Sequence, residues 1–292
     1  MMRKIKSREE LVYQIVVNSF LGVVLFLVIL PLWRVFILSV TPFKYVDNSF
    51  GLFVDPGKWT VEAYTQFLSH PSFLHAFRNS LVITFGGLAI NLFMTVPMSY
   101  ALSIRSLPGR KGFNVIAMIP FLFNAGLIPS YLVVTSLGLL NSYWAVIVPG
   151  AIGISNMFIM RNFFQEIPLD LKEAARIDGA SEFFILFRII LPLSIPIMLT
   201  IGLFYAVGHW NEFFGAILYL NDAKVQPLPV LLRNILMGLN TNEYIEYDAF
   251  SQVSVQSLKA ASIFITMLPM MMVYPGIQKY FVKGSLAGGI KG

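Results

Sequence analysis

Long apolar segments alternate with shorter polar ones along this chain of 292 residues. Six segments are apolar enough to cross a bilayer, since each reaches the roughly 20 residues that a hydrocarbon core requires. They cover about 12–38, 79–101, 113–134, 143–163, 193–219 and 258–281. This pattern predicts six transmembrane helices.

The composition supports the same interpretation. Hydrophobic residues make up 57% of the chain and charged residues 12%, with a mean hydropathy of +0.72. Soluble domains carry about twice that share of charge. We therefore expect an all-α integral membrane protein that forms a single transmembrane domain over residues 1–292. The sequence has no cysteine, which excludes disulfides and cysteine-based zinc or iron–sulfur sites.

The N-terminal segment combines a basic start with a long apolar run. Basic residues between Arg3 and Arg8 precede an apolar stretch from Val12 to about Val40. The apolar core of a signal peptide is only about 7–15 residues long. We therefore expect this stretch to be a retained first transmembrane helix.

The distribution of Lys and Arg predicts the orientation of the helices. If the N-terminus is cytoplasmic, fourteen of the 21 basic residues fall in cytoplasmic segments and seven in external ones. Cytoplasmic loops of membrane proteins carry an excess of Lys and Arg, so we expect both termini in the cytoplasm. The net charge of +6 then reflects topology, and we do not expect nucleic acid as a partner.

The cytoplasmic segment 164–192 differs from the other connections because it contains two short helical patterns. Pro168 suits the first turn of a helix, and good helix formers follow over 169–177. Gly179 permits the left-handed conformation that ends a helix, and Ser181 can cap the next one. The segment predicts a helix–turn–helix hairpin, which could be a docking surface for a soluble partner or an amphipathic hairpin on the membrane surface.

This hairpin carries a motif that resembles the EAA loop of the permeases of ATP-binding-cassette (ABC) importers. The motif is E-A-A, a glycine four residues after the last alanine, and I-x-L-P beginning ten residues beyond that glycine. All of these positions match within 173–192. The resemblance implies that the loop couples to an ATPase through Glu173, Ala174, Ala175, Arg176, Asp178, Gly179 and Ala180.

Other segments extend the resemblance over essentially the whole chain. Asn79-Ser80 is similar to the start of the family's core, and Trp210-Asn211-Glu212-Phe213 is similar to the W-N-x-F run of its carbohydrate-uptake subfamily. That subfamily includes the inner permease of the maltose transporter, and the tail 280–292 resembles its C-terminus.

The resemblance implies the type I ABC-importer permease fold, with 164–192 as the coupling loop. It implies that the chain forms half of the translocation pathway for a sugar, more specifically an oligosaccharide. The implied partners are a second homologous permease, two ATPase subunits and an extracytoplasmic solute-binding protein, in the inner membrane of a prokaryote. The sequence has no phosphate-binding loop, so we expect this chain to be no enzyme and to bind no cofactor, with ATP and Mg²⁺ on the ATPase.

Ionisable side chains inside membrane spans are costly and are therefore candidates for function. Arg34 lies near the end of the first span, where it can reach the membrane surface. His209 and Glu212 are three residues apart, which places them on one face of a continuous helix. With Trp210 and Asn211 they form the predicted substrate-pathway set. The alternative is an internal His–Glu pair that braces the permeases. No metal-binding motif is apparent.

Other kinds of protein remain as alternatives. An ABC permease for a solute other than sugar would carry the same hairpin. A stand-alone secondary transporter would need an internal repeat and charged relays at mid-bilayer, and the sequence shows no obvious repeat and few such charges. A membrane-embedded enzyme would need a catalytic constellation, which we do not find.

Overall fold

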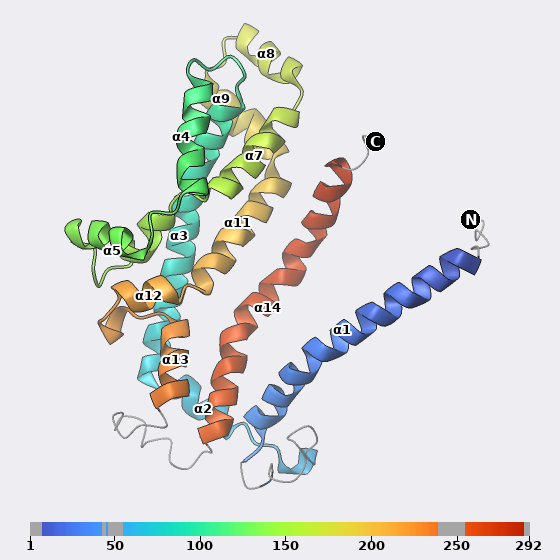
Figure 1. Ribbon diagram of the computed structural model, residues 1–292, viewed down its shortest axis with the longest axis vertical. Coiled ribbons are helices and arrows are strands. Elements are labelled where there is room, and N and C mark those ends of the chain that lie inside the picture. Colours follow the sequence, from blue (N-terminus) through green and yellow to red (C-terminus); the bar gives the residue numbers. More distant parts are fainter. Residues whose placement is uncertain (1–7, 43–44, 46–54, 239–254, 289–292) are drawn as a thin grey trace. The chain divides into compact units, whose positions relative to one another are not determined.

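The computed structural model describes residues 8–42, 45, 55–238 and 255–288, with 8, 255, 274 and 276–288 described by backbone alone (Figure 1). All regular elements in these ranges are helices, which confirms the predicted all-α class. Several sequence-based expectations concern residues outside the described ranges. They fall on the basic residues of 1–7, on Lys44, on 239–254 of the external segment and on 289–292 of the tail.

The described ranges contain the following helices. Their bounds are α1 Arg8–Val40, α2 Glu62–Ser69, α3 Pro71–Ser103, α4 Arg110–Leu122, α5 Leu127–Ser136, α6 Trp144–Ile147, α7 Ile154–Glu166, α8 Leu169–Ile177, α9 Glu182–Ile185, α10 Leu191–Leu193, α11 Ile195–Trp210, α12 Phe214–Tyr219, α13 Leu228–Gly238 and α14 Val255–Gly288. A π-helical segment, Leu186–Ile190, joins α9 to α10.

The chain packs as two compact units. The first unit comprises 1–70 and 234–267, and the second comprises 71–233 and 268–292. This division concerns packing alone, so the single transmembrane domain over 1–292 stays a prediction.

Aromatic rings and hydroxyl groups hold the first unit together. The ring of Phe36 on α1 lies 5.8 Å from the ring of Trp59 and 5.7 Å from that of Phe264 on α14, measured between centroids. The hydroxyls of Ser39 and Tyr64 are 2.6 Å apart and tie α1 to α2. The exposed remainder of α1 is almost wholly apolar, as a lipid-facing helix requires.

The number of potential membrane spans agrees with the prediction of six. Three helical stretches are long and apolar enough to cross a membrane alone, namely Glu9–Val40, Pro71–Ser103 and Gln256–Val273. Three more spans arise if each bent helix pair is counted as one. These pairs are Arg110–Leu122 with Leu127–Ser136, Trp144–Gly150 with Ile154–Glu166, and Glu182–Leu193 with Ile195–Trp210.

The predicted spans 113–134, 143–163 and 193–219 are wrong in one respect, because each is interrupted. The helices on either side of the break meet at 112° in the first span and at 48° in the second, and the 85° bend lies at the start of the third, between Leu193 and Ile195. The first break contains Gly126, whose φ of +87° is costly for any other residue type. The third follows the π-helical segment, and such segments disturb regular helix packing.

The predicted fifth span also ends earlier than expected. Helix α11 stops at Trp210, and α12 begins only at Phe214. The side-chain amide of Asn211 donates to the carbonyl of Val207 at 2.9 Å, and the carboxylate of Glu212 accepts the N–H of Gly215 at 2.8 Å. These side chains satisfy backbone groups that a helix end leaves free, and so they stabilise the interruption.

A buried polar stripe on α3 organises the second unit. Asn91, Thr95, Ser99 and Ser103 recur every four residues and are at most 4% exposed. Because residues four apart share a helix face, the stripe faces the neighbouring α7 and α11 (Figure 1). Hydrogen bonds between helices of this kind substitute for water inside a membrane.

Two of these bonds reach the break between α6 and α7. The amide of Asn91 donates to the carbonyl of Gly150 at 2.6 Å. The hydroxyl of Tyr205, which pairs with the Thr95 hydroxyl at 2.8 Å, accepts the N–H of Gly153 at 3.0 Å. Non-helical backbone at membrane depth is tolerated where neighbouring groups satisfy it, and this is how the interruption is accommodated.

Candidate functional site

The hairpin predicted over 164–192 is present. Helix α8 ends at Ile177, and Gly179 adopts a φ of +81°, as the sequence predicted. The N–H of Gly179 bonds to the carbonyl of Arg176 at 3.0 Å, and that of Ala180 bonds to the carbonyl of Ala175 at 2.9 Å. Ser181 then caps α9, since its hydroxyl accepts the N–H of Phe184. Helix and turn are thus fixed by local hydrogen bonds.

The outer surface of α8 carries exposed apolar side chains among acidic ones. Ile177 is 86% exposed and Leu169 is 58% exposed. Ala174 and Glu173 are exposed beside them. A side chain as apolar as Ile177 gains nothing from water, so this face is suited to contact with another surface.

The two predicted coupling alanines have different surroundings. Ala174 is exposed, whereas Ala175 is half-buried and packs, like Ala180, against the core formed by α3, α7 and α11. Asp178 is exposed in the turn. The predicted small-residue face is therefore split between an outward side and an inward side.

A buried lysine fixes the middle of α8. Lys172 is 5% exposed, and its ammonium donates to the carbonyl of Phe164 in the last turn of α7 at 2.8 Å. A cation at the C-terminal end of a helix is favoured by the helix dipole. Burial lowers the pKa of the Lys172 ammonium, the nearby Arg176 charge lowers it further, and the Glu182 charge acts in the opposite direction.

A second polar connection links α8 to α9 and α3. The guanidinium Nε of Arg176 donates to one carboxylate oxygen of Glu182 at 2.7 Å. The other oxygen accepts a hydrogen bond from the hydroxyl of Tyr100 on α3 at 2.5 Å. The hydrogen bond to Glu182 raises the pKa of the Arg176 guanidinium. We call these three residues the Tyr100–Glu182–Arg176 bridge.

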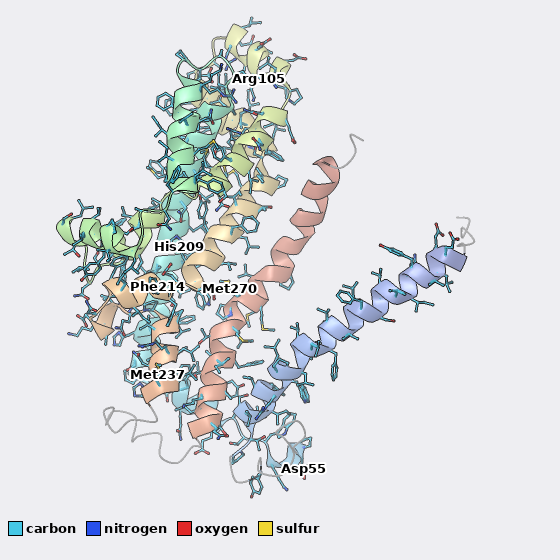
Figure 2. The ribbon with its side chains drawn as sticks, viewed as in Figure 1. Asp55, Arg105, His209, Phe214, Met237 and Met270 are labelled. Carbon is cyan, nitrogen blue, oxygen red and sulfur yellow. The ribbon has the colours of Figure 1, made fainter. Side chains whose placement is uncertain are left out.

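A cavity of about 400 Å³ opens beside the hairpin. It lies between the end of α3, the end of α7 and α8, and Figure 2 shows its residue Arg105 near α8. Its charged lining residues are Arg105, Glu166, Lys172, Glu173 and Arg176. Because three positive and two negative groups share it, the cavity has no strong preference for one sign of charge.

The predicted substrate-pathway residues lie elsewhere in the second unit. Figure 2 shows His209 well away from Arg105 along this unit. Helix α11 ends between His209 and Glu212, so the prediction that they share one helix face is wrong. They nevertheless meet at one cavity of about 400 Å³, which is also lined by Gly150, Phe204 and Tyr205.

Each of these four residues has a structural partner. The His209 Nε2 lies 2.6 Å from the amide oxygen of Asn91, and Glu212 caps α12 through Gly215. Trp210 is buried with its ring edge-on to Phe77, while Asn211 is exposed and bonds to its own helix.

The sequence also allowed an internal His–Glu pair. In the described part of the chain, His209 and Glu212 form no hydrogen bond or ion pair with each other. Both residues line the cavity. Their assignment to a substrate pathway stays a prediction. Arg34 is exposed on α1, as a residue that reaches towards the membrane surface would be.

Asn79 and Ser80 form hydrogen bonds to distant parts of the chain that the sequence did not predict. The Asn79 amide donates to the carbonyls of Lys224 and Gln226, and its oxygen accepts the Tyr143 hydroxyl. The Ser80 hydroxyl accepts the N–H of Leu228. The pair therefore anchors the connection between α12 and α13 to α3.

Sequence reasoning missed the anchoring roles of Lys172, Glu182 and Tyr100. Their partners are 8, 6 and 82 residues away. Only the Arg176–Glu182 pair carries a sequence signal, namely opposite charges on either side of a turn. Within the described ranges, no group of three or more His, Asp or Glu residues could hold a metal ion.

Comparisons with known proteins cover nearly the whole chain. Residues 11–285 match the family described as "Binding-protein-dependent transport system inner membrane component". Protein LplC of Bacillus subtilis (strain 168) is 43% identical over 87% of this chain and 90% of its own length. The "Polygalacturonan/rhamnogalacturonan transport system permease protein YtcP" of the same organism is 39% identical, over 96% of this chain and 98% of its own.

A solved structure agrees with these relatives. It comes from a bacterial ABC transporter involved in the import of the acidic polysaccharide alginate. One chain of that transporter superposes with a TM-score of 0.88 at 31% identity, over 96% of this chain and 100% of the other.

Proposed function

This chain belongs to the family of binding-protein-dependent transport system inner membrane components. We propose that α8 is the helix on which an ATPase docks and through which it changes the conformation of the permease. As an ABC importer permease of the sugar-transporting kind, it is a transport component and not an enzyme. We propose that it forms one half of a translocation pathway, with a second homologous permease supplying the other half.

The observation that carries this proposal is the exposed apolar face of α8. Ile177, Leu169 and Ala174 are exposed on a helix whose opposite side is fixed by Lys172. A short helix that is rigidly held from within and apolar on its outer side is suited to insertion into a groove of a partner.

The ATPase, the orientation and the binding protein complete the proposal. Two ATPase subunits bind ATP and Mg²⁺ and lie on the cytoplasmic side. The excess of basic residues in the corresponding segments supports both termini on that side. A solute-binding protein delivers the substrate from outside, in keeping with the family's description. The inner membrane of a prokaryote is the corresponding location.

We propose an oligosaccharide as the substrate. A relative of 39% identity is described as a polygalacturonan/rhamnogalacturonan permease, and the similar solved transporter imports an acidic polysaccharide. Oligosaccharides derived from acidic polysaccharides are therefore the first class to test. The cavity that His209 and Glu212 share is the candidate point of contact, since its polar side chains and the half-exposed ring of Phe204 suit sugar hydroxyls and sugar faces.

The docking role can be tested by co-purification of the ATPase. Co-expressed with its neighbours, the wild-type chain should retain the ATPase subunits, whereas Ile177→Ser should lose most of them because the change removes an exposed apolar contact. Leu137→Ser is the matched control, since Leu137 is 62% exposed but lies after α5, away from the hairpin. Equal retention in both variants would contradict the docking role.

Two other changes in the hairpin give less information. Gly179→Trp would force a side chain into a left-handed backbone conformation and would distort the turn itself. Ala175→Glu would place a carboxylate against the core. Loss of the ATPase in either variant could follow from a damaged hairpin, so Ile177→Ser is the sharper test.

The substrate class can be tested by uptake. The complete transporter, reconstituted into vesicles with its binding protein, should accumulate oligosaccharides in an ATP-dependent manner. Competition between acidic and neutral oligosaccharides of equal length would identify the preferred class. Uptake that proceeds without the ATPase would contradict the proposal and favour a secondary transporter.

A further inference from the structure

We propose that the Tyr100–Glu182–Arg176 bridge transmits the movement of α8 to the membrane-spanning helices, so that Tyr100 and Glu182 are positioning residues for energy coupling. The proposal rests on the proposed function, in which an ATPase moves α8. It concerns what lies behind the docking surface rather than the surface itself.

The bridge joins three elements that the chain keeps apart. Arg176 lies in the last turn of α8, Glu182 begins α9, and Tyr100 lies near the end of α3. The two oxygens of one carboxylate bond to Arg176 at 2.7 Å and to Tyr100 at 2.5 Å. Such charge-assisted bonds are short and directional, so they hold the two donors in a fixed relative position.

Tyr100 is the rigid end of this bridge. Its side chain is 4% exposed and lies edge-on to the ring of Phe164 on α7, with the ring centroids 6.5 Å apart. A residue packed in this way cannot follow Glu182 without moving the helix that carries it, because close-packed cores transmit displacement. Tilting α8 therefore pulls on α3.

The bridge acts beside a second attachment of α8. Lys172 holds the middle of the helix to the end of α7 through the carbonyl of Phe164. Two attachments at different points along α8 prevent it from pivoting about either one. Movement of the hairpin together with α3 and α7 keeps both attachments intact, which favours transmission of that movement to the spans.

Glu182 is also connected to α11 along the chain. The π-helical segment and α10 follow α9, and α11 carries Tyr205 and His209 to the second cavity. The polar stripe of α3 bonds to these two residues through Thr95 and Asn91. Both α3 and α11 thus lead from the bridge to the candidate substrate site.

The test compares transport with ATP consumption in the same preparation. In reconstituted transporter with binding protein, Tyr100→Phe removes one hydroxyl and Glu182→Gln removes one charge, and neither residue belongs to the exposed face of α8. We expect the ATPase subunits to co-purify as in wild type and ATP hydrolysis to persist. Oligosaccharide uptake per ATP hydrolysed should fall about tenfold, which is within the usual range of coupling between distant sites.

Matched variants separate this role from general damage. Glu9→Gln removes a carboxylate from the exposed first turn of α1, and Tyr131→Phe removes a hydroxyl from a ring stacked on Tyr219. Both should transport with the wild-type ratio of sugar to ATP. A purely structural role of the bridge would lower the yield or thermal stability of Tyr100→Phe and Glu182→Gln but would leave that ratio unchanged.

Each outcome decides between the proposals. An unchanged ratio in both bridge variants overturns the transmission role. Loss of the ATPase from the bridge variants overturns it too, because the bridge would then shape the docking surface. If the wild-type chain retains no ATPase at all, the docking function fails instead.

Discussion

The hairpin and the cavity near His209 stabilise their polar groups in opposite ways. The bridge at the hairpin uses a charged pair whose side chains are 34% and 48% exposed. Near the cavity, neutral Asn91 and Thr95 are 0% exposed. Asn91 bonds to the carbonyl of Gly150 and to His209, and Thr95 bonds to the hydroxyl of Tyr205. Charges are tolerated where water can reach them, and neutral hydrogen bonds are required where it cannot.

This difference indicates where substitutions should reduce stability most. Breaking a half-exposed ion pair costs little because water replaces the partner. Breaking a buried neutral bond leaves an unsatisfied group, which costs more. We expect substitutions near the cavity to reduce stability and substitutions in the bridge to reduce coupling.

The largest loss of stability is expected for Gly87→Ala. A Cβ at this position would overlap the imidazole ring of His209, which is held by Asn91. Overpacking of this kind costs about 2–3 kcal/mol. The midpoint of thermal unfolding of the purified chain in detergent should fall accordingly.

The neighbouring glycine offers a matched control for that substitution. A Cβ at Gly86 would meet only the Cδ1 of Ile147 at 3.8 Å, an ordinary contact. Gly86→Ala should therefore leave the unfolding midpoint unchanged or raise it slightly, since Ala favours helix. Equal midpoints for the two variants would show that His209 is free to move aside.

A smaller loss is expected for Tyr205→Phe. The change removes the hydroxyl that pairs with Thr95 and accepts the N–H of Gly153. An unsatisfied N–H at the helix break should cost about 1–2 kcal/mol in the free energy of unfolding. Thermal unfolding beside Tyr131→Phe, whose ring stacks on Tyr219, measures the difference. Similar stability of both variants would mean that another group satisfies Gly153.

Lys172→Met should have a modest effect that depends on pH. The variant loses the bond to Phe164, at a cost of about 1 kcal/mol near neutral pH. Because burial lowers the pKa of Lys172, the unfolded chain binds more protons than the folded chain just below the ordinary pKa of lysine. Wild-type stability should therefore gain with rising pH in that alkaline window.

The pH dependence of Lys172 is measured from unfolding midpoints across the alkaline range. Lys172→Met should lack the gain seen in the wild type, so the two midpoints should diverge as pH rises. Lys58→Met is a suitable reference, since Lys58 is exposed. Parallel curves for wild type and Lys172→Met would contradict the lowered pKa.

The smallest effect is expected for the Arg176–Glu182 pair. A double-mutant cycle with Arg176→Gln and Glu182→Gln should give a coupling energy of about 0.5 kcal/mol, as for other exposed ion pairs. The cycle is measured by thermal unfolding at low and high salt, and the coupling should shrink as salt is added. A coupling energy above about 2 kcal/mol would mean that the hairpin pair is as costly to break as the buried hydrogen bonds near His209.

The hairpin could be predicted in detail because its signals are local. The helix over 169–177, the left-handed Gly179 and the cap by Ser181 all depend on residues within a few positions of one another. Backbone preference and short-range hydrogen bonds fix such a segment before any distant contact forms.

The cavity could not be predicted in the same way. Hydropathy indicated one continuous helix over 193–219, yet α11 ends at Trp210 because Asn211 and Glu212 bond to the backbone there. Apolar content identifies a span but says nothing of its bends. The partner of His209 is Asn91, 118 residues earlier, and no local pattern connects them.

The sequence alone determined the membrane class, the six apolar segments, the hairpin and the family resemblance, because hydropathy, turn chemistry and short motifs act over a few residues to a few turns. The tertiary structure decided which of those segments are bent, which side of α8 faces outward, and which groups Tyr100, Lys172 and His209 meet. Those outcomes depend on contacts between segments far apart in the chain, and such contacts form only when the helices pack together.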